Sequence, residues 1–197
     1  MFLSNGMSVF AVEPNDAMRT AAERSLGDQV SFHSIKGTAE ETTLPGASVD
    51  LIFCAQAFHW FDPIRAPREF RRIATSGAHV ALVWNSRPAK ATPFINGYEQ
   101  LLQTYGIDYA NVRHRGIAQD ELSRIFGRIF EYHVLSNTQE FDFAGLRGRL
   151  LSSSYAPVEG HSNHAPMIAA LADLFARSQR EGRVTMLYDT EIYITRL

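Results

Sequence analysis

Short runs of hydrophobic residues alternate with amphipathic segments along the first hundred residues of the chain. The run Val9-Phe10-Ala11-Val12 stops at Glu13 and Pro14, and a longer, mostly apolar run covers 49–55. Strand-length runs that alternate with helix-length segments are typical of βαβ units, in which helices cover both faces of a mostly parallel sheet. We therefore predict strands at 9–12, 30–35, 49–55 and 80–84, and helices at 14–26 and 62–74. The run 49–55 is expected to be fully buried at the centre of the sheet.

The second half of the chain is predominantly helical before it returns to the sheet. We predict helices at 94–105, 119–126, 143–152 and 166–181, and strands at 132–138 and 184–195. The last strand alternates polar with apolar residues, which is typical of an antiparallel edge strand. We expect one domain, 1–197, with a helical, lid-like insertion at 143–182 before the last strand.

Composition narrows the class of protein. The 197 residues are 45% hydrophobic and 20% charged, which suits a single buried core. The net charge is -2 and the only lysines are Lys36 and Lys90, so we expect no nucleic-acid partner. No run approaches the roughly 20 apolar residues that span a bilayer, and the first residues do not form a signal peptide. We therefore expect a cytoplasmic protein with no membrane partner.

Cysteine and histidine usage argues against disulfide and metal chemistry. Cys54 is the single cysteine and lies in an apolar run, so we expect a buried, unreactive thiol and a reducing compartment. His161 and His164 lack nearby cysteines and helical metal-ligand spacing, and we expect no metal site.

Several segments, in the right order and spacing, resemble one enzyme family. They are Val12-Glu13-Pro14-Asn15, Gly37-Thr38-Ala39-Glu40, Leu44-Pro45, Val49-Asp50-Leu51-Ile52, Ala55-Gln56-Ala57-Phe58-His59-Trp60-Phe61-Asp62 and the terminal Leu187-Tyr188-Asp189-Thr190-Glu191-Ile192-Tyr193. Together they resemble the class I S-adenosylmethionine-dependent methyltransferases, and are most similar to the small-molecule branch that includes trans-aconitate methyltransferase. The resemblance covers nearly the whole chain. It implies a Rossmann-like α/β sheet with helices on both faces, S-adenosylmethionine as cofactor and a small-molecule methyl acceptor.

The resemblance also assigns cofactor-binding roles. Glu13, at the end of a strand, matches the acid that accepts both ribose hydroxyls, as a carboxylate can; the alternative is a solvated strand-end glutamate. Ala39 and Glu40 match the pair that borders the adenine, although Glu40 could equally be a surface acid beside Glu41. Gln56 follows the strand 49–55, at the carboxyl end where open α/β sheets bind their ligands.

The chemistry is expected beside His59 and Trp60. They match positions at the methyl-donor mouth, where an aromatic face stabilises the sulfonium by cation–π attraction and a histidine accepts a proton from the acceptor. The alternative is that Phe58, Trp60 and Phe61 pack under the following helix and that His59 is a structural neighbour.

Substrate-binding candidates lie further along the chain. Tyr155 resembles a lid position that faces the acceptor in relatives. Arg87 follows the strand 80–84 and could pair with a carboxylate substrate through its planar guanidinium, or be an ordinary surface arginine. Arg147 and Arg149 are interpreted as the solvated face of a helix.

One family feature is missing from these 197 residues. Class I methyltransferases begin with a strand and a glycine-rich turn that lets the backbone approach the methionine part of the cofactor, and here Met1 aligns after that turn. The missing strand would lie between 9–12 and 49–55, and unpaired buried backbone groups cost about 1–3 kcal/mol each. Compensation could come from direct pairing of the flanking strands, from a homo-oligomer, or from a longer native product.

Three readings of the function therefore stay open. The first is a small-molecule methyltransferase, inactive in this truncated form if the missing segment is essential. The second is a degenerate, non-catalytic module that binds a partner or self-associates through the exposed sheet edge. The third is a nucleoside-binding reductase that uses Glu13. The absence of the glycine-rich turn argues against this reading at least as strongly. Were the first reading correct, Glu13 and the segment 56–62 would be neighbours at one rim of a shared sheet.

Overall fold

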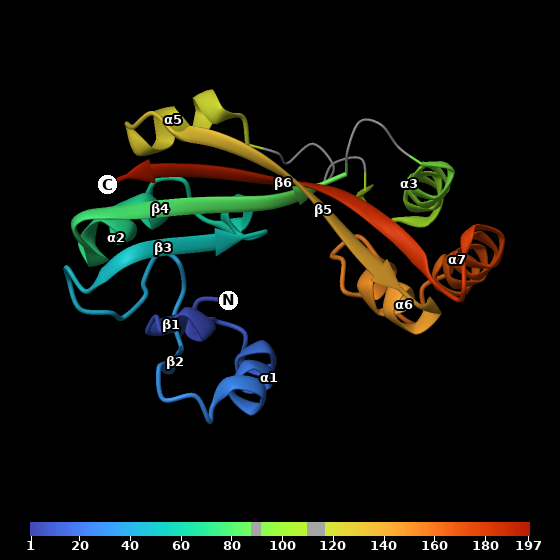
Figure 1. The fold of residues 1–197 in the computed structure, drawn as a ribbon, viewed down its shortest axis with the longest axis horizontal. Helices are drawn as coiled ribbons and strands as arrows, with labels where there is room; N and C mark the ends of the chain where they lie inside the picture. The colour runs from blue at the N-terminus through green and yellow to red at the C-terminus, as the bar shows by residue number, and fades with distance from the viewer. Residues whose placement is uncertain (88–91, 110–116) are drawn as a thin grey trace. The chain divides into compact units, whose positions relative to one another are not determined.

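The computed structural model describes residues 1–87, 92–109 and 117–197, and it divides into two compact units (Figure 1). The first unit consists of Met1–Leu82, Ala118–Glu131 and Tyr193–Leu197, and the second of Val83–Ile117 and Tyr132–Ile192. Three strands continue from one unit into the other along the chain. Each unit is therefore described by itself.

The helices and strands follow the predicted order along the chain. They are η1 (Leu3–Asn5), β1 (Val9–Val12), α1 (Asp16–Leu26), β2 (Phe32–Ile35), β3 (Val49–Ala55), η2 (Phe58–Trp60), α2 (Arg65–Ile73), β4 (Ala74–Ser86), α3 (Pro93–Tyr105), α5 (Gln119–Phe126), β5 (Glu131–Phe141), α6 (Phe143–Leu151), α7 (His164–Ser178) and β6 (Val184–Arg196).

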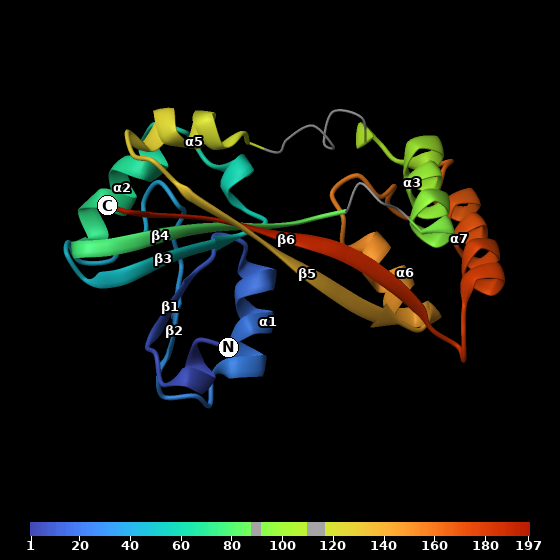
Figure 2. The ribbon, with the colours of Figure 1, turned by 45° about the horizontal axis from the view of Figure 1, so that its top comes forward.

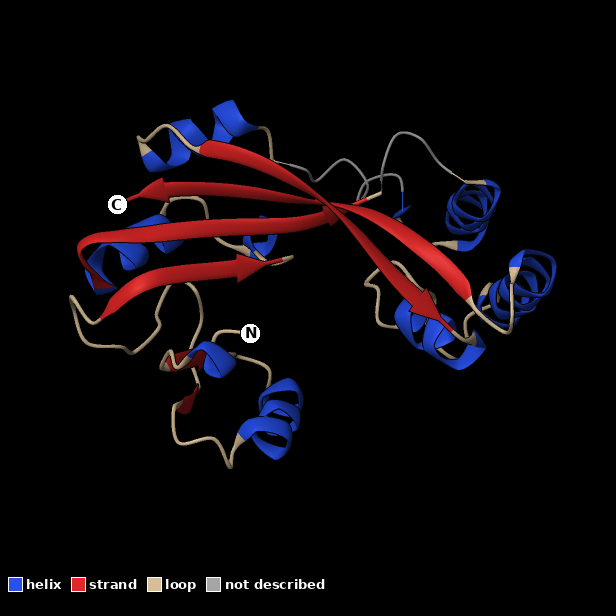
Figure 3. Ribbon diagram, viewed as in Figure 1, coloured by secondary structure: helices blue, strands red, loops and turns tan. Residues whose placement is uncertain are grey.

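The strands form two sheets. β1 and β2 pair in parallel, with Val9 opposite Phe32 and Val12 opposite Ile35. The larger sheet has the order β3-β4-β6-β5, and Figure 3 shows β6 running opposite to β4 and β5. The β1–β2 sheet lies beyond β3, on the side away from β4 (Figures 1 and 2). This mixed α/β fold with helices packed on a sheet confirms the predicted fold class.

Two predicted strand positions are wrong. β3 was expected at the centre of one sheet, but it ends the four-stranded sheet, and Leu51 and Phe53 are 39% and 41% exposed. β6 was expected at an edge and instead lies between β4 and β5. An alternation of polar and apolar residues indicates that one face of a strand is less buried than the other, and this holds equally for a strand in the interior of a sheet. The alternation therefore cannot predict whether a strand lies at the edge of its sheet.

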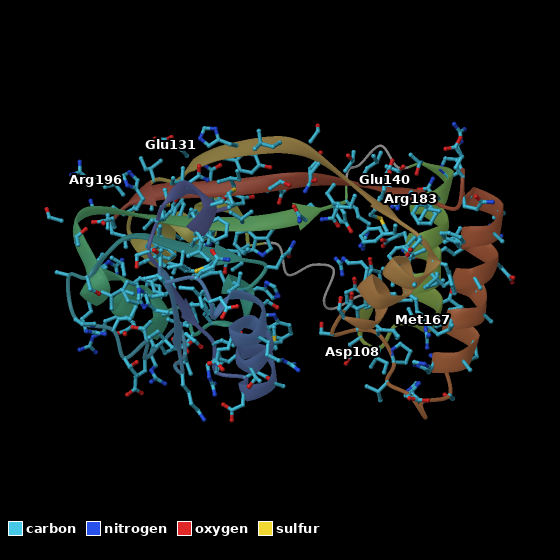
Figure 4. The ribbon with its side chains drawn as sticks, turned by 60° about the horizontal axis from the view of Figure 1, so that its bottom comes forward. Asp108, Glu131, Glu140, Met167, Arg183 and Arg196 are labelled. Atoms are coloured by element: carbon cyan, nitrogen blue, oxygen red, sulfur yellow. The ribbon has the colours of Figure 1, made fainter. Side chains whose placement is uncertain are left out.

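Two local predictions near helix ends are also corrected. α1 starts one residue after Asn15, whose side chain accepts hydrogen bonds from the N–H groups of Ala17 and Met18, so Asn15 rather than Pro14 opens the helix. Gly77 does not end a helix, because β4 already begins at Ala74. Gly77 has a φ of +87°, and a Cβ there would lie 2.5 Å from the guanidinium of Arg196 (labelled in Figure 4).

The core of the first unit is a chain of phenylalanine rings between α2, α5 and the sheet. Phe58 and Phe126 have ring centroids 5.5 Å apart, and Phe126 contacts Phe130 at 5.3 Å. Phe70 of α2 also meets Phe126, at 6.4 Å. Figure 2 shows α2 and α5 together on one side of β3 and β4. Burying these rings fixes η2, and with it the loop after β3.

The core of the second unit is built from α3, α6, α7 and the start of β6. Gly97 of α3 lets α7 approach closely, since a Cβ at this position would lie 2.6 Å from Cδ1 of Leu174. Met167 of α7, labelled in Figure 4, is buried in the same cluster. The predicted insertion 143–182 lies within this unit, which also contains α3. The expectation of a single domain stays a prediction.

Candidate functional site

Glu13 follows β1 directly and lies at the start of α1. Its Oε1 accepts a hydrogen bond of 2.8 Å from the backbone N–H of Asn15. Its own N–H donates to the carbonyl of Ile35 at 3.0 Å, which extends the β1–β2 ladder by one residue. Oε2 has no hydrogen-bond partner within the described ranges, and this oxygen is the one that can receive a ligand hydroxyl.

A tight turn at 38–41 presents Ala39 and Glu40. The backbone of Thr38 and Glu41 exchanges two hydrogen bonds, of 3.1 and 3.2 Å, and the Thr38 hydroxyl accepts a third from the N–H of Glu41. These bonds close the turn. They hold Ala39 and Glu40 at its tip, where both are half-buried.

Glu40 is joined to the loop that follows β3. Its Oε1 accepts a hydrogen bond of 2.9 Å from the backbone N–H of Asp62. Burial by itself would raise the pKa of Glu40, but this bond, further hydrogen bonds within the turn and the charge of Arg65 lower it below its ordinary value. Glu40 is therefore an ionised acceptor near neutral pH.

Asp62 in turn anchors the beginning of α2. Its Oδ1 accepts hydrogen bonds from the N–H groups of Ile64 and Arg65, at 2.9 and 2.8 Å. Hydrogen bonds from the Arg65 and Ile64 backbone lower the pKa of Asp62, with a further contribution from the charge of Arg65. This arrangement is a helix cap that fixes the far end of the segment 56–62.

An ion pair between the buried Glu69 and the more exposed Arg72 fixes the turn to the same helix. Oε1 of Glu69, on α2, accepts hydrogen bonds from the N–H and hydroxyl of Thr42, and Arg72 Nε donates to Oε2 at 2.7 Å. Arg72 also donates to the carbonyl of Leu44 at 2.7 Å. The hydrogen bonds from Arg72 lower the pKa of Glu69 most, burial opposes them, and the hydrogen bonds from Thr42 lower the pKa further. The result is a pKa of about 2. The turn 38–41 is thereby positioned from two sides.

The segment 56–62 carries the remaining predicted cofactor and catalytic residues. Gln56 has a φ of +54°, a left-handed conformation that is unfavourable for a residue with a Cβ and is often found at functional sites. Phe58 is buried, whereas Trp60 is 56% exposed. The His59 and Trp60 rings lie 5.0 Å apart at 45°. Only part of the packing alternative therefore holds, because Phe58 anchors the loop and Trp60 does not share its burial.

Arg87 and Tyr155, the two predicted substrate residues, meet in the second unit. Arg87 pairs with Glu99 at 2.9 Å, and its guanidinium carbon lies 5.9 Å from the ring centroid of Tyr109. The hydroxyl of Tyr109 donates to Glu99 at 2.7 Å, and Tyr109 and Tyr155 have ring centroids 4.9 Å apart. Although burial would lower the pKa of Arg87, the nearby Tyr109, Glu99 and Tyr155 raise it. Sequence patterns identified Arg87 and Tyr155 but gave no signal for Glu99 or Tyr109.

The predicted residues thus fall into three places rather than one. Ala39, Glu40 and the segment 56–62 share one end of the first unit. Glu13 belongs to the β1–β2 sheet, so the prediction that Glu13 and the segment 56–62 border a shared sheet is wrong. The reason is that β1 and β3 do not pair with each other, because β1 pairs with β2 and β3 pairs with β4. Arg87 and Tyr155 belong to the second unit.

Other features of the described ranges lie apart from these residues. A surface hollow of about 450 Å³ is lined by Pro63, Ile64, Pro67, Arg71, Arg124 and Ile125, none of which was predicted to bind a ligand. No group of three His, Cys, Asp or Glu side chains in 1–87, 92–109 and 117–197 is arranged to hold a metal ion. Within the same ranges, no helix has the length and apolar character needed to cross a membrane. Cys54 is buried, and burial raises its pKa to about 12.

Comparisons with known proteins bear on the family. Residues 1–82 match the family described as a methyltransferase domain. The uncharacterized methyltransferase Rv3342 of Mycobacterium tuberculosis is 35% identical over 113 residues, which cover 57% of this chain and 44% of that protein. An uncharacterized methyltransferase-like protein of Schizosaccharomyces pombe is 38% identical over 72 residues, which cover 36% of this chain and 28% of that protein. The chain therefore spans less than half the length of these curated relatives.

Solved structures support the same fold. A protein described as a type II methyltransferase from Anaeromyxobacter dehalogenans superposes with a TM-score of 0.64 at 24% identity, covering 95% of this chain and 80% of that one. A protein described as a methyltransferase of an antibiotic biosynthesis pathway from Anabaena variabilis gives a TM-score of 0.60 at 19% identity, covering 98% and 83%. The methyltransferase-domain match and these likenesses of fold support the predicted resemblance to class I S-adenosylmethionine-dependent methyltransferases. The trans-aconitate branch stays a prediction.

Proposed function

We propose that this chain is part of an S-adenosylmethionine-dependent methyltransferase that acts on a small molecule. The observation that supports this most directly is the hydrogen bond from the Asp62 N–H to Glu40, which joins the predicted adenine-binding turn to the loop that carries His59 and Trp60. Open α/β sheets bind their ligands outside the carboxyl ends of their strands. This contact lies just past such an end, after β3.

Each predicted residue has a physical role in the proposal. Although Glu13 belongs to the β1–β2 sheet, its N–H is bonded to Ile35 at the end of β2, and the turn 38–41 follows that strand. In this proposal Glu13 offers Oε2 to the ribose hydroxyls, the backbone of Ala39 and the carboxylate of Glu40 border the adenine, and Gln56 and Trp60 line the methyl-donor side. The cofactor supplies an electrophilic methyl group on a positively charged sulfur. Holding the acceptor in line with that methyl group provides most of the catalytic effect, and His59 takes the proton that the acceptor loses.

Cofactor binding tests the proposal directly. Isothermal titration with S-adenosylhomocysteine should give measurable heat with the natural chain, and Glu13→Gln should weaken binding by about tenfold, since hydrogen bonds to a charged acceptor contribute about 1.5–3 kcal/mol. Asp28→Asn, at an exposed acid after α1, is the matched control and should leave the affinity unchanged. The glycine-rich turn is absent from 1–197, so we expect millimolar affinity. No heat at millimolar ligand would remove this chain as a competent enzyme.

A second candidate function rests on the free side of β3. Among the strands that the structure describes, β3 pairs only with β4. Leu51 and Phe53 are partly exposed, although Phe2 contacts Phe53 at 4.9 Å between ring centroids. An unpaired strand edge can recruit another strand, from a partner or a second copy. The chain would then be a non-catalytic assembly module. The pairing of β3 on one side only is the observation that favours it.

Light scattering over a range of concentrations separates the two candidates. The assembly module predicts a concentration-dependent dimer or a co-purifying partner, and Leu51→Lys should shift the chain to monomer because a charge on an edge strand blocks pairing. Val134→Lys, at an exposed apolar position of β5, is the control for adding charge. A monomer at every concentration, with no co-purifying protein, would count against this candidate.

A further inference from the structure

The second unit gathers buried phenols and two arginines within electrostatic reach of each other. Tyr98 of α3 is buried; burial raises its pKa most, Tyr155 adds to the rise, and the charges of Arg149 and Arg87 oppose it. Burial also raises the pKa of Tyr109, as does its hydrogen bond to Glu99. The phenols of Tyr98 and Tyr109 are therefore neutral near pH 7, and the charges among these described residues come from the two arginines and Glu99.

The two arginines have different surroundings. Arg87 is neutralised by Glu99 at 2.9 Å, and the hydroxyl of Tyr109 binds both of these side chains. Arg149 instead donates one hydrogen bond, of 3.2 Å, to the neutral hydroxyl of Ser153. Among the residues that the structure describes, no carboxylate forms an ion pair with Arg149. Within this cluster of described residues, the positive charge of Arg149 therefore has no carboxylate paired to it.

Position on α6 explains why Arg149 is held beside the cluster. Leu146 and Leu150 of the same helix are fully buried in the core of the second unit. Arg149 is half-buried, whereas Arg147 is exposed, so the earlier interpretation of both as a solvated face is wrong for Arg149. A half-buried guanidinium without a counter-charge loses solvation and gains no ion pair in return. Such a site stabilises an anion that reaches it.

We propose that Arg149 binds a carboxylate group of a small molecule held within the second unit, beside Tyr98 and Tyr155. This inference goes beyond the proposed function, and it moves the recognition of a carboxylate from Arg87, whose guanidinium is already paired, to Arg149. The net charge of Arg87, Arg149 and Glu99 together is +1, which the charge of a single carboxylate balances. A phosphate dianion would leave one charge unbalanced. The planar guanidinium also fits the two oxygens of a carboxylate.

Three small probes test this site on the full chain. Ligand-observed NMR and titration calorimetry would compare benzoate with its uncharged isostere benzamide and with phenyl phosphate. We expect benzoate to bind with millimolar affinity and at least about tenfold more tightly than benzamide, a difference of about 1.4 kcal/mol. Arg149→Gln should abolish that preference and Arg149→Lys should retain part of it. Arg147→Gln, on the exposed side of the same helix, should change nothing.

The outcomes that overturn the inference are distinct from failure of the proposed function. Equal binding of benzoate and benzamide, unchanged binding by Arg149→Gln, or no binding of benzoate would each overturn the assignment of Arg149. Tighter binding of phenyl phosphate would overturn the carboxylate in favour of a phosphate. S-adenosylhomocysteine titrated into the same samples tests cofactor binding separately, because the predicted cofactor residues lie in the first unit.

Thermal unfolding gives a second readout that does not depend on the probe. An arginine kept only for structure should lose stability when replaced by methionine, which fills a similar volume without charge. A guanidinium kept for binding, with no carboxylate paired to it, should not lose stability on this substitution. We therefore expect Arg149→Met to unfold at the same or a higher temperature. A clear fall in the unfolding temperature would indicate a structural role and overturn the proposal.

Discussion

The backbone N–H of Asp62 donates a hydrogen bond of 2.9 Å to Oε1 of Glu40, across 22 positions of sequence. The bond connects a turn that follows β2 with a loop that follows β3, although these two strands belong to different sheets. One carboxylate oxygen thus fixes the loop. Glu40 therefore has a structural role besides the adenine-binding role proposed for it.

Substitution of Glu40 should separate these two roles. Glu40→Gln keeps an oxygen that can accept from Asp62 but removes the charge, so we expect little change in stability and a loss of about 3–10-fold in affinity for S-adenosylhomocysteine, as for a charged hydrogen bond replaced by a neutral one. Titration calorimetry measures the affinity. Glu41→Gln, the exposed neighbour, is the control, and an equal loss in that variant would contradict the role of Glu40.

Acid should destabilise the protein through Glu69. The pKa of Glu69 is lowered from 4.5 to about 2, so this carboxylate stabilises the fold above pH 4.5 and loses that contribution as the pH falls towards 2. We expect the unfolding free energy from urea titrations to fall over this range. Glu69→Gln should be less stable at pH 7 by about 1–3 kcal/mol, because it weakens the bonds from Thr42 and Arg72, and should depend less on pH below 4.5.

Glu121→Gln provides the comparison for this experiment. Glu121 is exposed on α5, and its substitution should leave both the stability at pH 7 and the acid profile unchanged. A profile for Glu69→Gln that parallels the natural chain between pH 4.5 and 2 would show that another carboxylate is responsible.

Local patterns in the sequence predicted the elements well because each element buries its own apolar stripe. The strand 49–55 and the helix 119–126 were predicted at the bounds that the structure shows. What could not be predicted is which strand lies beside which, since pairing depends on contacts between distant residues. β3 at an edge and β6 in the interior are both of this kind. The lack of pairing between β1 and β3 is likewise what places Glu13 and the segment 56–62 on different sheets.

The same limit applies to charged residues. Arg147 and Arg149 flank the buried stripe of Leu146 and Leu150 at similar angles on an ideal helix of about 100° per residue. Helical periodicity therefore cannot distinguish the exposed arginine from the half-buried one. The partners of Arg87 were equally hidden, because Glu99 lies on α3 and its spacing from Arg87 matches no known motif. Only the packing of the second unit reveals them.

Cys54 provides a direct measure of the integrity of β3. Burial raises the pKa of its thiol to about 12, so almost no thiolate exists at pH 8 in the folded chain. Reaction with a chromogenic disulfide reagent should be at least about a hundredfold slower in the native protein than in guanidinium chloride. The chain has one cysteine, so the signal needs no control for other thiols. Rapid labelling of the native protein would mean that β3 is not held in the sheet.

Trp60 should distinguish the methyl donor from its product. An exposed tryptophan face attracts a cation by about 0.5–1 kcal/mol, and S-adenosylmethionine carries a positive sulfur whereas S-adenosylhomocysteine does not. We expect Trp60→Ala to weaken binding of S-adenosylmethionine about 2–5-fold more than that of S-adenosylhomocysteine. Trp60→Phe should retain part of this preference because it keeps an aromatic face. Parallel titrations of both ligands measure it, and equal losses for the two would indicate that Trp60 acts only through packing.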